Sequence, residues 1–179
     1  MHPKKRFKPN VTSIEHLPNE LFLEIFNYLT NIDIVCAFAR VNQRFQALTL
    51  KYCHAFDFTS VSKAKFDYVI RYHNIHQWRS LRLSDDDDTP GQVTHFCRLF
   101  PFGEYISQLE VLSIMHTKPK AALIFLPQLR SFANLVSLSL GSVCGKSIPS
   151  LECHSLKHLV INSCMHTQWM KVKFVCDRS

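Results

Sequence analysis

A short apolar motif recurs through the second part of this 179-residue chain. Each copy has two strand-forming apolar residues with one residue between them, and most copies carry a further leucine or tryptophan three positions earlier. The copies begin at Phe56, Leu81, Leu112, Leu138 and Leu159, at steps of 25, 31, 26 and 21 residues. One such unit cannot bury its own leucines, so the pattern requires the units to stack on one another.

Steps of roughly 20–30 residues around this core are typical of leucine-rich repeats, in which each unit supplies one short parallel strand and one outer segment. We therefore predict an α/β solenoid of about five units with a parallel sheet over 54–179. Apolar residues at helical spacing predict outer helices across 66–73 and 93–100. Prolines limit 118–132 to one short helix with a turn. Alternating apolar residues predict a closing strand over 172–176.

The segment from Leu17 to Leu48, before these units, reads as three short helices in succession. The first is expected to open with Pro18, whose fixed φ suits the first helical position, and Glu20 complements the helix dipole in its first turn. This helix is apolar round most of its circumference. Its surface is either covered by the rest of the chain or reserved for a partner, and we favour the partner.

Polar residues mark the starts of the other two helices. Asn31 and Asp33 can cap the second helix, and Asn42 can cap the third. The residues of the third helix at the spacing of one buried face are Phe45, Leu48 and Tyr52. We expect this helix to cap the amino-terminal end of the repeat stack.

Two blocks of this segment carry a family resemblance. The first reads Leu-Pro-x-Glu and then Ile-Phe-x-x-Leu, with Leu17, Pro18, Glu20, Ile25, Phe26 and Leu29. The second contains Val41 and Arg44. Together, over about 14–52, they resemble the F-box, the module that attaches substrate receptors to the Skp adaptor of cullin-based ubiquitin ligases. Asn42 and Phe45 stand where the family often has Cys and Trp, and they keep the roles of a small or capping residue and a large aromatic.

The resemblance implies a non-catalytic adaptor of an SCF-type ligase that acts in ubiquitin-dependent protein degradation. It divides the chain into a basic tail expected to be disordered (1–12), an F-box (13–53) and a leucine-rich-repeat-like substrate-binding region (54–179). The implied partners are the Skp adaptor, cullin through that adaptor, and a protein substrate. The residues implied to contact the Skp adaptor are Leu17, Pro18, Leu21, Ile25, Phe26, Leu29, Ile34, Val41 and Phe45.

Polar residues within and beside the predicted strands are candidates for substrate binding. Residues between the two leucines of each motif face away from the core, so they form a row across neighbouring strands. The reading as a substrate-contacting stripe and the reading as ordinary solvent exposure carry equal weight. The candidates are Arg79, Arg82, Asp85, Asp86, Glu110, Ser113, Ser139 and Lys157.

Composition excludes several classes of protein. No run approaches the roughly 18 apolar residues of a membrane helix, and the first ten residues lack the apolar core of a signal peptide, so we expect a cytoplasmic or nuclear protein without a membrane association. The seven scattered cysteines fit reduced, packed thiols. The net charge of +7 leaves a rival, a basic repeat protein that binds nucleic acid or a chromatin partner with the helices as a cap. We disfavour it because no later element combines clustered Lys and Arg with aromatics.

No sequence feature predicts a metal, a cofactor or a common catalytic motif. The four residues Cys153, His154, Cys164 and His166 lack the close pairs of a structural zinc site, and adjacent residues of a strand point opposite ways. The run 85–88 lacks the interleaved ligands of a calcium loop and reads as a solvated turn. Its position after a strand also suits a partner surface, which would attract a basic segment of a substrate.

Overall fold

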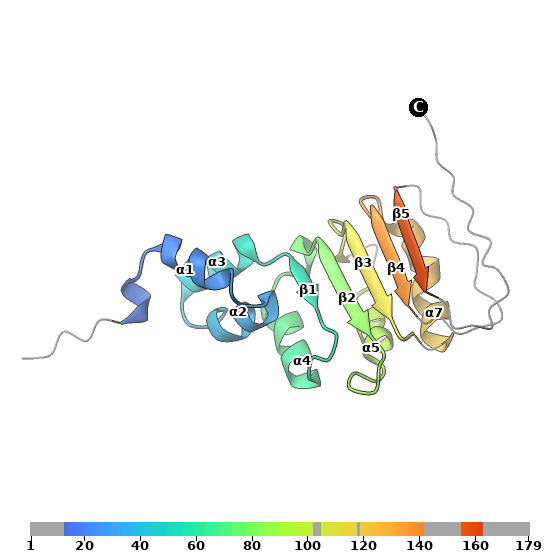
Figure 1. Cartoon of the computed structure of the whole chain (residues 1–179), viewed down its shortest axis with the longest axis horizontal. Helices are drawn as coiled ribbons and strands as arrows, with labels where there is room; N and C mark the ends of the chain where they lie inside the picture. Colours follow the sequence, from blue (N-terminus) through green and yellow to red (C-terminus); the bar gives the residue numbers. More distant parts are fainter. Residues whose placement is uncertain (1–12, 102–104, 118, 142–154, 163–179) are drawn as a thin grey trace, which may run out of the picture. The chain divides into compact units, whose positions relative to one another are not determined.

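The computed structural model describes residues 13–101, 105–117, 119–141 and 155–162 (Figure 1). Its contacts divide the chain into two compact units, Met1–Thr30 and Asn31–Ser179. The division falls inside the predicted F-box segment, between its first and second helices.

The first unit contains the 3-10 turn η1 (Ile14–His16) and helix α1 (Asn19–Phe26). Ser13 caps η1, since its side chain accepts a hydrogen bond of 3.3 Å from the backbone N–H of Glu15. Pro18 has an extended backbone and is the N-cap residue of α1, so the prediction that it occupies the first helical position is wrong by one residue. Its fixed φ is compatible with both positions, and ψ decides between them.

Helices α2 (Asn31–Phe38) and α3 (Gln43–Tyr52) open the second unit. Asn42 caps α3 as predicted, because its side-chain oxygen accepts a hydrogen bond of 3.0 Å from the backbone N–H of Phe45. Asn31 donates from its side-chain amide to the carbonyl of Ala55 at 2.7 Å, which ties α2 to the start of the sheet.

The predicted buried face of α3 is wrong at one position. Phe45 and Leu48 are buried, but Tyr52 is 40% exposed and Thr49 is buried in the next turn. Thr49 (i+4 from Phe45) and Tyr52 (i+7) both lie on the same side of the helix as Phe45. The apolar pattern alone therefore did not show which of the two is buried.

Five parallel strands form one sheet in chain order. They are β1 (Ala55–Asp57), β2 (Ser80–Ser84), β3 (Val111–Met115), β4 (Ser137–Gly141) and β5 (His158–Asn162). The register pairs the first apolar residue of each motif with that of the next, from Phe56 with Leu81 to Leu138 with Leu159. The five strands and the parallel sheet are therefore confirmed at the predicted places.

Helical segments connect the strands. They are α4 (Lys63–Tyr72), η2 (Ile75–Gln77), α5 (Gln92–Leu99), α7 (Pro119–Phe125) and η3 (Leu126–Ser131). In Figure 1, α5 and α7 lie along the same face of the sheet. The predicted helices over 66–73 and 93–100 are confirmed, each ending one residue early, and 118–132 gives the predicted short helix followed by a tighter turn.

The core changes character along the sheet. Beneath β1 and β2 it is aromatic, with ring centroids 4.5 Å apart for Phe56 and Trp78 and 4.8 Å apart for Phe58 and Phe66. Beneath the next strands it is aliphatic, and its fully buried residues include Leu112, Ile114, Leu138 and Leu140. Large rings in one layer and branched side chains in the next fill the space under the strands without a second sheet.

One buried polar contact joins α3 to this core. The indole Nε1–H of Trp78 donates to Nδ1 of buried His73 at 2.9 Å, and Nε2 of His73 lies 3.3 Å from the carbonyl oxygen of Thr49. A neutral imidazole with its proton on Nε2 satisfies both contacts. Burial, which disfavours the charged form, lowers the pKa of His73 below that of an ordinary histidine.

The cysteines of the described part of the chain, Cys36, Cys53 and Cys97, are free thiols. Burial raises the pKa of Cys53 and of Cys97 to about 12, so both remain protonated packing residues. Among the helices that the structure describes, none combines the length and the apolar character needed to cross a membrane.

Several predictions lie outside the described residues. They concern the tail 1–12, the closing strand 172–176 and the disfavoured zinc set Cys153, His154, Cys164 and His166. Within the described residues, no group of three or more His, Cys, Asp or Glu side chains is placed to hold a metal ion.

Candidate docking surfaces

Helix α1 and the turn after it leave large apolar side chains in solvent. Leu21 is 46% exposed, Leu29 is 39% exposed and Tyr28 is more exposed than either. Pro18 is exposed, and Leu17 and Ile25 are half-buried. An apolar helix surface of this kind, on a chain whose other leucines are mostly buried, is typical of a protein interaction site.

The remaining predicted contacts for the Skp adaptor differ in exposure. Val41, in the turn before α3, is 48% exposed. Phe26, Ile34 and Phe45 are buried, at 7%, 2% and 1% exposure, so in this conformation they support the helices from inside and offer little surface to a partner. Sequence periodicity groups these residues with their exposed neighbours because a wide apolar stripe includes both core and surface positions.

The open face of the sheet carries the predicted polar row. The register sets Arg82 beside Ser113, Ser113 beside Ser139, and Ser139 beside Val160. A second row lies just before the starts of β2 to β5. Backbone hydrogen bonds of 2.8–2.9 Å link Arg79 to Glu110, Glu110 to Val136 and Val136 to Lys157. The candidate residues Arg79, Arg82, Glu110, Ser113, Ser139 and Lys157 are thus brought together, and their role in binding stays a prediction.

Ion pairs already engage both arginines of this face. Arg82 lies 3.1 Å from Asp57 and 3.5 Å from the hydroxyl of Ser113, and Arg79 lies 3.4 Å from Glu110. Partial burial alone would raise the pKa of Asp57, but hydrogen bonds from Thr59 and Arg82 outweigh it and lower the pKa. Exposed pairs of this kind contribute little stability, so a partner could displace them at small cost.

The acidic run after β2 is not the uniformly solvated turn that the sequence suggests. Asp85 is buried, and its Oδ1 accepts a hydrogen bond of 2.9 Å from the backbone N–H of Val93 in the first turn of α5. Asp85 is therefore buried and bonded to the start of α5 in this conformation, and its role as a substrate contact stays a prediction. A carboxylate in contact with the first turn of a helix is favoured because the helix dipole attracts negative charge there.

Asp86 organises the same loop from a half-buried position. Its side chain accepts from the backbone N–H groups of Asp88 and Thr89 at 3.1 and 2.8 Å and from the hydroxyl of Ser84 at 2.9 Å. The hydrogen bond from the Thr89 hydroxyl is the largest of the contacts that lower the pKa of Asp86. Asp87 and Asp88 are left exposed.

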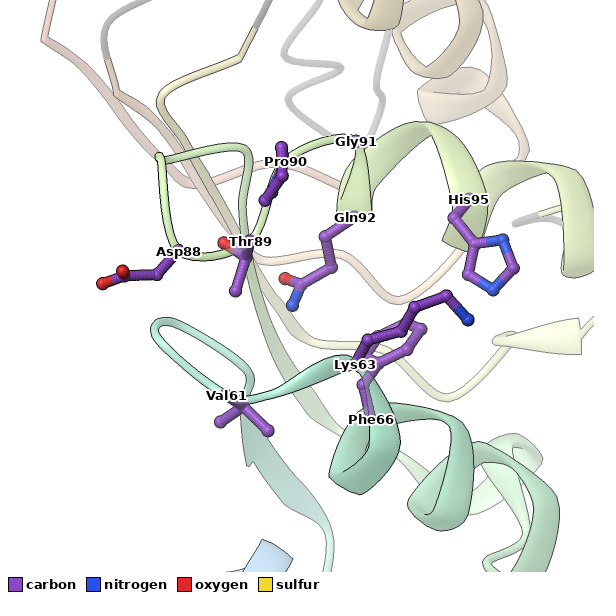
Figure 2. A pocket seen from close by; sticks show the side chains of 9 residues that line it. All are labelled: Val61, Lys63, Phe66, Asp88, Thr89, Pro90, Gly91, Gln92 and His95. Carbon is purple, nitrogen blue, oxygen red and sulfur yellow. The ribbon is translucent and has the colours of Figure 1, made fainter.

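A small pocket that the sequence did not predict lies beside this loop (Figure 2). It is bounded by the turn into α4 and by the turn into α5. No local pattern could have found it, since its walls come from segments about 30 residues apart that meet because β1 and β2 are neighbours.

Comparison with known proteins supports the assignment of the first helices. A family model described as F-box-like matches residues 14–53. No curated protein and no solved structure matches the chain. Residues 14–53 thus form an F-box-like domain, and a parallel five-stranded sheet with helices follows it.

Proposed function

We propose that this chain is the substrate-recognition adaptor of a cullin-based, SCF-type ubiquitin ligase. F-box domains in general bind the Skp adaptor, and the F-box-like match covers α1. The observation that carries the proposal is the exposure of Leu21 and Leu29 within that match, because apolar side chains on a short helix are stabilised when a partner covers them.

In this proposal the sheet region is a short leucine-rich-repeat array that holds a protein substrate. Strands in chain order, with the leucines of each motif in register, are what such an array requires. The chain contributes proximity and orientation, and ubiquitin transfer belongs to other subunits. It acts in the cytoplasm or nucleus, reaches cullin through the Skp adaptor, and directs its substrate to degradation.

Co-purification with the Skp adaptor tests the docking step. Leu21→Glu places a charge on the exposed surface of α1, and we expect it to abolish a complex that the unaltered chain forms at micromolar concentration. Leu123→Glu is the matched control, because Leu123 is a comparably exposed leucine (57%) on α7 and lies outside the F-box-like match.

The proposal fails if the unaltered, folded chain forms no complex with the Skp adaptor. It also fails if Leu21→Glu and Leu123→Glu weaken the complex equally, since binding would then not depend on α1.

A further inference from the structure

The pocket beside the acidic loop has room for one large side chain. Its volume is about 190 Å³, below the roughly 300–1,000 Å³ typical of small-molecule sites. Val61, Phe66 and Pro90 give it apolar walls. Figure 2 shows the two turns facing each other across it, with Asp88 at one end and His95 at the other.

The pocket is preformed, because side chains tie its two walls together. The buried amide of Gln92 donates to the carbonyl of Phe58 at 3.1 Å and accepts from the backbone N–H of Ser84 at 3.0 Å. The Thr89 hydroxyl lies 2.8 Å from the Ser84 carbonyl, and this contact holds the polar end of the Thr89 side chain inside the acidic loop. A site held in this way needs little ordering when a ligand enters.

The charge around the pocket is acidic at one end. Of the acidic residues that the structure describes after Thr30, those outside the run 85–88 each form an ion pair with Lys or Arg. They are Asp33, Asp57, Asp67 and Glu110. The structure gives Asp87 and Asp88 no such pair, although the whole chain carries a net charge of +7.

The other end of the pocket is close to neutral. Lys63 forms an ion pair with Asp67, and Nε2 of His95 lies 3.5 Å from the same carboxylate. Lys63 therefore has a counter-ion at this end, whereas no ion pair within the described residues engages Asp87 or Asp88 at the other end. An occupant with positive charge on the side of Asp87 and Asp88 complements this distribution.

We propose that this pocket docks a protein segment that carries one large apolar side chain next to Lys or Arg residues. The inference rests on the proposed function, since such a segment would belong to the substrate of the adaptor. The apolar side chain fills the space between Val61, Phe66 and Pro90 as an anchor, and the basic residues pair with Asp87 and Asp88.

Peptide binding to the intact, purified chain, without the Skp adaptor, tests the inference. The probe is a fluorescein-labelled peptide with one phenylalanine flanked by two lysines on each side. We expect alanine in place of the phenylalanine to weaken binding about tenfold, since the anchor's burial is lost. We expect glutamates in place of the lysines to abolish binding, and added salt to weaken binding of the basic peptide.

Variants of the chain locate the site. Asp87→Asn with Asp88→Asn should weaken binding of the basic peptide about fivefold, from two exposed charge pairs. Glu20→Gln with Glu24→Gln is the matched control, because it makes the same change in net charge on α1 and should leave binding unchanged. Val61→Phe should fill the pocket and remove the preference for phenylalanine over alanine in the peptide. If that variant does not fold, the two peptides on the unaltered chain still measure the preference.

Three outcomes overturn the inference. Equal binding of the phenylalanine and alanine peptides would show that the pocket is not used. Equal loss in the aspartate and glutamate variants would show general attraction to negative charge. A several-fold gain in binding on Phe7→Ala would assign the pocket to the chain's own basic tail. Each of these outcomes leaves co-purification with the Skp adaptor unaffected, so failure here is distinct from failure of the proposed function.

Discussion

Leucines serve two different purposes in this chain. Those of the sheet motifs in β2, β3 and β4, such as Leu81 and Leu138, are completely buried, whereas Leu21 and Leu29 in and after α1 remain 46% and 39% exposed. The difference follows from the neighbours that each element has. A strand in a stack receives a layer of side chains from its helices, while the first helix carries apolar residues on more of its circumference than one packed face requires.

The comparison teaches that leucine content alone does not identify a core. In the sheet the apolar residues recur at a fixed position in each unit, and the register brings these positions together. In α1 they occupy several positions around one short helix. Apolar residues that recur along the chain predict that successive units of the same chain pack on one another. Apolar residues crowded on one helix predict a separate binding partner.

The largest expected effect on stability comes from removing a buried leucine of the sheet. Leu112→Ala removes a completely buried side chain from the central strand β3, and we expect it to lower the free energy of unfolding by about 3 kcal/mol. Leu21→Ala, in contrast, should lower it by less than about 1 kcal/mol, because the side chain is already half in water. Urea unfolding followed by circular dichroism measures both. Similar losses in the two variants would mean that α1 is core and that its exposed surface is not kept for a partner.

A smaller effect is expected at the start of α3, which is F-box-like in sequence but lies in the same unit as the sheet. Asn42→Ala removes the side-chain cap on the N–H of Phe45 and should cost about 1 kcal/mol. In a Trp169→Phe background, fluorescence of the remaining Trp78 reports on the sheet core. The unfolding midpoint at Trp78 should fall with the cap. An unchanged midpoint would show that α3 unfolds separately from the sheet.

The smallest effect is expected from pH, because protonation of His73 would cost one hydrogen bond and no packing volume. Burial lowers the pKa of His73 in the folded chain, so below the ordinary value of 6.5 the unfolded chain binds this proton more readily. Stability should therefore fall as the pH drops below 6.5 and stop falling once the pH is below the folded pKa. His73→Gln should be less stable near neutral pH and should show a shallower dependence between pH 7 and 5. Equal slopes for the two proteins would remove His73 from this role.

Much of the fold could be predicted from the sequence, for reasons that particular residues make clear. The pairs Leu81–Leu83, Leu112–Ile114 and Leu138–Leu140 predicted both the strands and their alignment, because stacking is the way in which such units bury their leucines. Asn42 predicted its own cap, since that interaction is local. The candidate site residues were harder to predict, because the exposure of a side chain depends on what packs against its helix or strand. Phe45 and Tyr52 share one stripe of α3, yet the first is buried and the second is exposed.

The sequence by itself determined where the strands lie, which residues begin α3, and that α1 has more apolar surface than one packed face uses. These properties depend on spacing and on contacts within one element. Tertiary structure alone decided that Asp85 is buried against the first turn of α5, that Ile34 and Phe45 lie inside, and that Val61 and Pro90 line the same pocket. Periodicity defines the face of an element, but the burial of that face is set by neighbours that are distant in the chain.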